Sequence, residues 1–123
     1  MHSGSARYGL LAALLMVAPM AHANDANYET PLLRLAEVLG SIHYLRNLCG
    51  EETGTWRAKM EELLDTEDPT AARREKLIAS FNRGYRAFAG TYENCTDQAM
   101  TAIDHYMNEG SRLSTEIVQR YGN

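Results

Sequence analysis

The chain has 123 residues, a formal net charge of −4 and a charged fraction of 23%. This length predicts one small domain. The acidic balance argues against a nucleic-acid-binding protein, because such proteins present a basic face to the phosphates.

The first residues predict a secretory signal peptide, not a part of the fold. Arg7 gives a positive amino-terminal region, an apolar run follows at 10–18, and Ala21 to Ala23 supply a small-x-small cleavage pattern. The run is far shorter than the ~20 apolar residues that a membrane span needs, although an uncleaved anchor is the alternative. We therefore expect cleavage between Ala23 and Asn24 and export of the mature chain.

The mature chain, residues 24–123, is expected to form a single soluble domain without a membrane span, because no second long apolar run follows. Both cysteines lie in this part, and an even number in an exported small domain predicts a disulfide. Only one pairing is possible, Cys49 with Cys95. A redox-active pair is the alternative, but it favours close spacing such as C-x-x-C.

Helical periodicity runs through the mature chain, and no strand-like alternation of useful length appears. Thr30 and Pro31 predict the start of the first helix, since threonine is a good N-cap and proline suits the first helical position. We expect residues 24–29 to be a frayed polar lead. The helix should run to about Cys49 and stop at Gly50.

Three further helices are expected. Thr55 is the expected cap of a short helix at 56–66, and Asp68-Pro69 signal a third helix at 69–94 whose polar first turns project past the core. A fourth helix follows at about 97–121. The break of one to three residues before it forces its two flanking helices to be antiparallel neighbours.

The stretch 77–95 carries both phenylalanines of the chain on one helical face, so we expect the other helices to pack around it. Gly84 lies within this apolar face. A glycine there lowers helix propensity by roughly 1 kcal/mol relative to alanine, which predicts a close approach by a neighbouring backbone. Gly90 lies on the opposite face and is a candidate bend.

The same helix offers the best candidate binding surface, since arginine and tyrosine are favoured anchors in protein contacts and also suit anionic or glycan ligands. Its residues are Asn82, Arg83, Tyr85, Arg86 and Tyr92. The alternative is that the tyrosines are half-buried core residues. Arg46, in the apolar arc of the first helix, either lays its stem on the core with its charge in water or pairs with a carboxylate or an anionic ligand.

The sequence offers no catalytic constellation, cofactor motif or metal site. No G-x-S-x-G, S-x-x-K or C-x-x-C-H is present, and the predicted disulfide removes both thiols as nucleophiles. His105 and Glu109 form a possible two-ligand edge on one helix, but charge pairs with neighbouring residues are the better explanation. His43 is better explained by hydrogen-bonded packing than by ligation.

The segments LRNLCG (45–50), SFNRGYRAFAGTY (80–92) and EGSRLSTEIVQRYG (109–122) carry a resemblance. With Trp56-Arg57 and Cys95-Thr96 they resemble a family of small exported helical proteins of Gram-negative bacteria, known as a domain of unknown function with two well-separated cysteines. The resemblance covers nearly all of the mature chain. It implies a periplasmic location and a disulfide between the two cysteines, but no activity and no catalytic residue.

Together these patterns predict an all-α protein, an antiparallel bundle of three long helices and one short one with a disulfide near one end. The expected function is a non-enzymatic periplasmic interaction or scaffold protein, a cell-envelope accessory factor whose partner is an envelope protein or a cell-wall component. A small ligand-binding bundle for a cell-wall fragment or an anion is the alternative. An envelope enzyme would need two carboxylates across a cleft.

Overall fold

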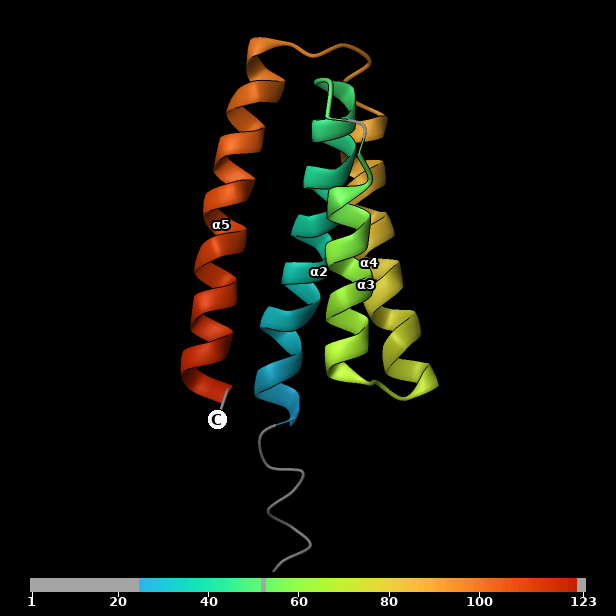
Figure 1. Cartoon of the computed structure of the whole chain (residues 1–123), viewed down its shortest axis with the longest axis vertical. Coiled ribbons are helices and arrows are strands. Elements are labelled where there is room, and N and C mark those ends of the chain that lie inside the picture. Colours follow the sequence, from blue (N-terminus) through green and yellow to red (C-terminus); the bar gives the residue numbers. More distant parts are fainter. Residues whose placement is uncertain (1–24, 52, 122–123) are drawn as a thin grey trace, which may run out of the picture.

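The computed structural model describes residues 25–51 and 53–121. This part of the chain forms four helices, α2 (Asp25–Leu48), α3 (Thr55–Glu67), α4 (Ala71–Ala89) and α5 (Asp97–Tyr121). In Figure 1, α2 and α4 run upward and α3 and α5 run downward, so helices that follow one another in sequence are antiparallel. The predicted all-α bundle of three long helices and one short one is confirmed. The predicted cleavage between Ala23 and Asn24 lies outside the described residues.

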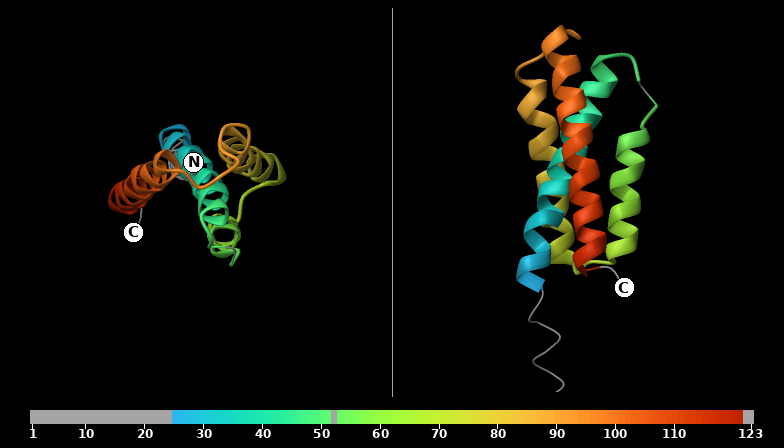
Figure 2. Two further views of the ribbon diagram at one scale, coloured as in Figure 1. Left: turned by 90° about the horizontal axis from the view of Figure 1, so that it is seen from above. Right: turned by 90° about the vertical axis from the view of Figure 1, so that its left-hand side faces the viewer.

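The central helix is α2. Extensive contacts join α2 to each of the other three helices, whereas α5 has extensive contacts with α2 alone among the described elements. Seen from above, α3, α4 and α5 surround α2 (Figure 2). The expectation that the other helices pack around residues 77–95 was therefore wrong. The reason lies in the middle of α2, where ten of fourteen consecutive residues are buried: Leu32, Leu35, Ala36, Val38, Leu39, Gly40, Ser41, Ile42, His43 and Leu45. A helix that is buried on most of its circumference is surrounded by its neighbours.

The amino-terminal turn of α2 corrects the predicted start at Thr30, because the helix begins at Asp25 and contains Pro31. A proline inside a helix cannot donate an N–H to the carbonyl four residues earlier, here that of Asn27. The Tyr121 hydroxyl of α5 donates to this carbonyl at 3.2 Å. Because a tertiary contact replaces the missing helical hydrogen bond, the described part of the predicted lead, residues 25–29, is helical and not frayed.

The start of α4 is also tied down. Thr70, not Asp68, caps this helix, and its hydroxyl accepts a hydrogen bond from the Arg73 amide at 3.3 Å. Arg73 in turn donates to carboxylates of Glu29 on α2 and Glu67 on α3. The prediction that the polar first turns project past the core was therefore wrong at Arg73. The start of α3 differs slightly as well, because Gly54, with φ 71°, occupies the N-cap position expected for Thr55.

The carboxyl-terminal end of α4 lies at Ala89, five residues earlier than predicted (94 − 89), and residues 90–96 connect it to α5. Glycine propagates a helix poorly, so Gly90 ends it instead of bending it. The Tyr44 hydroxyl of α2 donates to the Tyr92 carbonyl, which holds the connection against the central helix. The predicted break of one to three residues was too short, but the predicted bounds of α5 are confirmed.

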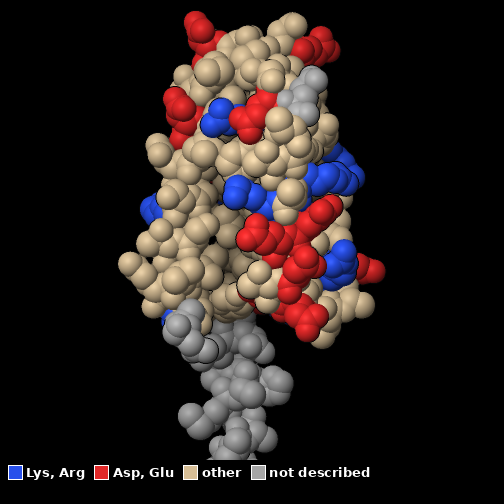
Figure 3. All heavy atoms as spheres, in the orientation of Figure 1, with Lys and Arg blue, Asp and Glu red and all other residues tan. Residues whose placement is uncertain are grey.

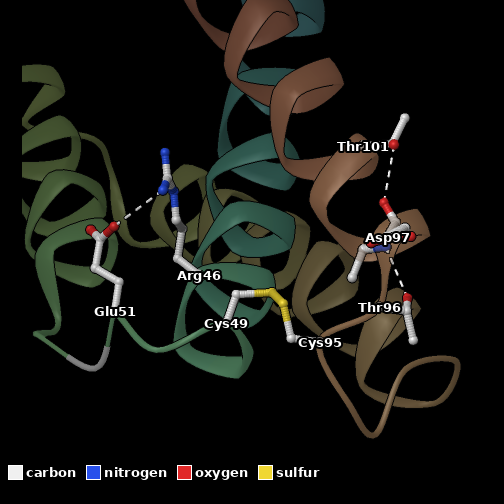
Figure 4. The surroundings of a disulfide bond; sticks show 8 residues. Arg46, Cys49, Glu51, Cys95, Thr96, Asp97 and Thr101 are labelled. Carbon is white, nitrogen blue, oxygen red and sulfur yellow. Dashed lines mark hydrogen bonds and ion pairs between the residues drawn. A yellow bond between two sulfur atoms is a disulfide. The ribbon is translucent and has the colours of Figure 1, made fainter.

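The disulfide joins the end of α2 to this connection. Cys49 and Cys95 are bonded, with their Cα atoms 5.0 Å apart (Figure 4). The end of α2 and the connection between α4 and α5 both lie at the upper end of the bundle (Figure 1). The predicted pairing is confirmed. Within the described ranges no helix is long and apolar enough to cross a membrane.

Candidate functional site

An apolar groove runs between α3 and α5, with α2 as its floor. Its volume is about 300 Å³. Its lining residues are Tyr28, Leu32, Leu35 and Leu39 of α2, Lys59, Glu62, Leu63, Thr66 and Glu67 of α3, and Ser114, Ile117 and Val118 of α5. The space-filling view faces this side of the molecule and shows the surface hollowed between α5 and α3 (Figure 3). The floor from Tyr28 to Leu39 spans about 16 Å of helix, which is about three turns.

The groove is open because α5 packs on α2 and not on α3. On the α5 wall of the groove the apolar side chain of Val118 is 67% exposed. An exposed apolar side chain at the rim of an apolar groove is accessible to a binding partner.

Charge is distributed unevenly around the groove. The charged lining residues Lys59, Glu62 and Glu67 all belong to α3, and the α5 wall contributes none. Acidic side chains gather over the lower part of α3, whereas the visible face of α5 is largely uncharged (Figure 3). At the lower end the Tyr28 hydroxyl donates to Glu67, and burial together with this carboxylate raises the pKa of Tyr28. The lower end of the groove is therefore electronegative along the α3 wall.

A chain of ion pairs crosses α2 between α4 and α5. Arg83 of α4 donates to Glu37 of α2 at 2.7 Å, and Arg34 of α2 binds Glu37 at 2.6 Å and Glu109 of α5 at 2.6 Å. Hydrogen bonds from Arg83 and from Arg34 hold the pKa values of Glu37 and Glu109, respectively, below their usual range. The guanidinium of Arg34 also lies 5.9 Å from the ring centroid of Tyr106. This arrangement joins three helices.

The predicted binding surface on α4 is divided between two sides of the helix. Arg83 points to Glu37 on α2, while Asn82 lines a second cavity of about 180 Å³ between α3 and α4. Arg86 is exposed and makes no ion pair with a described residue. The predicted residues therefore do not form one continuous site.

The two predicted tyrosines pack among aromatic side chains. Tyr85 lies edge-on to Tyr44 with ring centroids 5.2 Å apart, and Tyr92 stacks on Phe88 at 6.0 Å. Tyr92 is half-buried and Tyr85 is 36% exposed, which agrees with the alternative that these residues belong to the edge of the core.

The buried imidazole of His43 lies between the rings of Phe81 and Tyr85, 5.7 Å from each. Burial and the nearby charge of Arg57 lower the pKa of His43, so the neutral form is favoured. Its Nδ1 atom has no hydrogen-bond partner among the described residues. The side chain of His43 therefore packs among its neighbours as expected, but its Nδ1 atom does not make the expected hydrogen bond.

Arg46 was predicted either to keep its charge in water or to pair with a carboxylate or an anionic ligand, and it has features of both. Its side chain is 34% exposed, and its guanidinium lies 3.5 Å from the carboxylate of Glu51 at the end of the same helical region (Figure 4). The Glu51 amide also donates to the Arg46 carbonyl at 2.8 Å. The arginine therefore has a carboxylate partner within its own chain.

The second cavity, between α3 and α4, combines cationic and apolar side chains. It is lined by Arg57, Met60, Glu61, Leu64, Arg74, Ile78, Phe81 and Asn82. Arg57 and Arg74 make no ion pair with other described residues. The guanidinium groups of Arg57 and Arg74 outnumber the one carboxylate, that of Glu61, so the charge of the lining is net positive and suits a small anion.

The possible metal ligands His105 and Glu109 make contacts within the fold instead. Glu109, the proposed partner of His105 in a metal site, binds Arg34 instead, and His105 lies edge-on to Tyr106. Within the described residues no group of three or more His, Cys, Asp and Glu side chains is placed to hold a metal ion.

The sequence patterns did not identify the residues that line the groove. Val118 follows the same apolar periodicity as the core residues of α5, and no local signal separates residues that face α2 from residues that line the groove. Only the exposure of these side chains in the fold distinguishes them.

The geometry defines a small helical protein, closed at one end by a disulfide and open along an apolar groove. The chain belongs to a family described as Protein of unknown function (DUF2385), which matches residues 27–121. Searches of curated proteins and of solved structures find no match.

Proposed function

We propose that this protein is an exported, non-enzymatic interaction protein of the Gram-negative periplasm, an accessory factor of the cell envelope. The observation that carries the proposal is the apolar groove between α3 and α5, which ends beside the exposed side chain of Val118. Open grooves lined mainly by apolar side chains are common binding sites on proteins. The signal-like residues 10–23 and the disulfide support export, because disulfides persist in oxidising compartments.

The absence of an enzymatic role is part of this proposal. The two carboxylates that line the groove, Glu62 and Glu67, come from the same wall, and Glu67 is bound to Tyr28 and Arg73. Acid–base hydrolysis of a glycosidic bond needs carboxylates on opposite sides of the bond. The groove is better suited to binding than to this chemistry.

Site-specific photo-crosslinking in cells tests the interaction. A photoreactive residue at Ser114, which lines the groove, should crosslink to a distinct envelope component in the periplasmic fraction. The matched control is Thr101, an exposed residue of the same helix that lines neither cavity. Identical products at both positions, or none at Ser114, would contradict the proposal, as would recovery of the protein only from the cytoplasm.

A second candidate function is the binding of a small anion, favoured by the cavity that contains Arg57, Arg74 and Asn82. A thermal-shift titration with inorganic phosphate and with muropeptides tests it. Stabilisation that is lost in Arg57→Gln with Arg74→Gln supports this function, and the absence of stabilisation removes it.

A further inference from the structure

We infer that the groove between α3 and α5 receives an amphipathic helix of another protein, one that carries basic residues along the edge facing α3. This inference rests on the proposed function and specifies the chemistry of the partner. It follows from the direction of the helices, the length of the groove and the charges on its walls.

Direction comes first. Both α3 and α5 run downward, and α2 between them runs upward (Figure 1). An upward helix in the groove would be antiparallel to both of its walls and would complete a four-helix bundle of alternating direction with α2, α3 and α5. Its amino terminus would then lie at the lower end, beside the carboxyl-terminal ends of α3 and α5. Opposed helix dipoles favour that direction.

Length and surface chemistry come second. The α2 floor spans about three turns of helix, with Leu32, Leu35 and Leu39 at its centre. The α5 wall is shorter, since its lining residues lie within the turn 114–118, so α5 would flank a bound helix along about one turn. An amphipathic helix presents apolar side chains at i, i+3, i+4 and i+7, which is the spacing that fills such a groove. The volume of about 300 Å³ suits a few aliphatic side chains.

Charge decides between possible occupants. The α3 wall carries Glu62 and Glu67 toward its lower end and Lys59 one turn above Glu62, while the lining of the α5 wall is uncharged. Arg73 contacts Glu67 only at 3.4 Å and Glu62 makes no ion pair with a described residue. A basic side chain in the lower half of the bound helix would meet Glu62, whereas an acidic one would be repelled. On the α5 side the helix should be apolar or neutral.

Binding of synthetic peptides tests this inference. The probe is a labelled 15-residue amphipathic helical peptide with leucines at i, i+3, i+4 and i+7 and lysines on one flank, measured by fluorescence anisotropy with the mature, oxidised protein. The second peptide, which serves as the control, has glutamates in place of the lysines. The lysine peptide should bind about fivefold tighter, the factor that one exposed ion pair supplies, and the difference should shrink at high salt.

Substitutions on the walls locate the site. Glu62→Lys should reverse the preference between the two peptides, whereas Glu61→Lys, the same charge change on the residue that lines the other cavity, should leave it unchanged. Val118→Glu should weaken both peptides, and because Val118 is 67% exposed this variant is expected to fold. Circular dichroism of each variant verifies folding.

The outcomes separate the two proposals. Equal binding of both peptides, no binding, or binding unaffected by Val118→Glu overturns the inference. Sedimentation that shows a dimer abolished by Val118→Glu also overturns it, in favour of a second copy of this chain. If Ser114 nevertheless crosslinks to an envelope component in cells, the proposed function stands while the inferred partner chemistry fails.

Discussion

Gly40 of α2 and Gly84 of α4 each lie against the backbone of the opposite helix, at a distance that leaves no space for a methyl group. A Cβ atom on Gly40 would lie 1.9 Å from the carbonyl oxygen of Phe81, and one on Gly84 would lie 1.9 Å from that of Glu37. The Ser41 hydroxyl donates to the Gly84 carbonyl at 3.1 Å across the same contact. The close approach expected from Gly84 is therefore confirmed, and it is reciprocal.

Gly84→Ala should destabilise the protein by about 2 kcal/mol. Alanine raises helix propensity by roughly 1 kcal/mol, but overpacking against a backbone oxygen costs more, because the helix has to move as a whole. Urea unfolding followed by circular dichroism measures the change. Gly90→Ala is the control, since the nearest atom to its added Cβ would be 3.8 Å away. Equal stability of the two variants would contradict the steric argument.

Removal of the disulfide should lower the free energy of unfolding by about 4 kcal/mol. The bond closes a loop between residues 46 positions apart, and its loss frees the conformational entropy of the unfolded chain. The double variant Cys49→Ser with Cys95→Ser is compared with the oxidised protein in urea unfolding. Alkylation of either cysteine in the exported protein without prior reduction would show that the bond is not formed in cells.

Glu109→Gln should cost about 1 kcal/mol at neutral pH, because it weakens the bidentate contact with Arg34, whose side chain is 41% exposed. The folded-state pKa of Glu109 is lowered, so its contribution is complete above the ordinary value of 4.5 and is lost as pH falls through the lower, folded value. The difference between wild type and variant should therefore shrink in acid. Glu61→Gln, an exposed control, should change stability little at any pH; a constant gap for Glu109→Gln would contradict this prediction.

His43 should make stability depend on pH in a different window. Its folded-state pKa lies below the ordinary 6.5, so the unfolded chain takes up the proton first and stability falls as pH decreases from about 6.5. In His43→Leu this part of the pH dependence should disappear, whereas His105→Gln, at an exposed position, should retain it. Thermal unfolding across this range measures both. An unchanged profile in His43→Leu would assign the effect to another group.

Helix ends were predicted less well than helices. Pro31 is a good first-turn residue, and nothing near it in sequence indicates that Tyr121, ninety positions later, compensates its missing N–H. Gly90 was recognised as a weak point, but whether a glycine bends or ends a helix depends on what the following residues bind. Here the Tyr92 carbonyl accepts a hydrogen bond from Tyr44, which favours the connection over another helical turn.

The candidate site was predicted least well. Arg83 is of a residue type that is common in recognition sites, yet it pairs with Glu37 on a neighbouring helix. Partners of this kind come from elements distant in sequence, so periodicity on one helix cannot reveal them. The groove has the same origin, because it depends on the spacing between α3 and α5 and not on either helix alone.

Periodicity, capping residues and the two cysteines were sufficient to establish the all-α character of the part of the chain that the structure describes, the four helices there and the disulfide, because these properties follow from interactions within a turn or from the only possible pairing. The choice of α2 as the central helix, the pairing of its charges and the open groove beside α5 required the folded arrangement. They arise from contacts among three or four helices, whose relative positions are set by packing as close as that of Gly40 and Gly84.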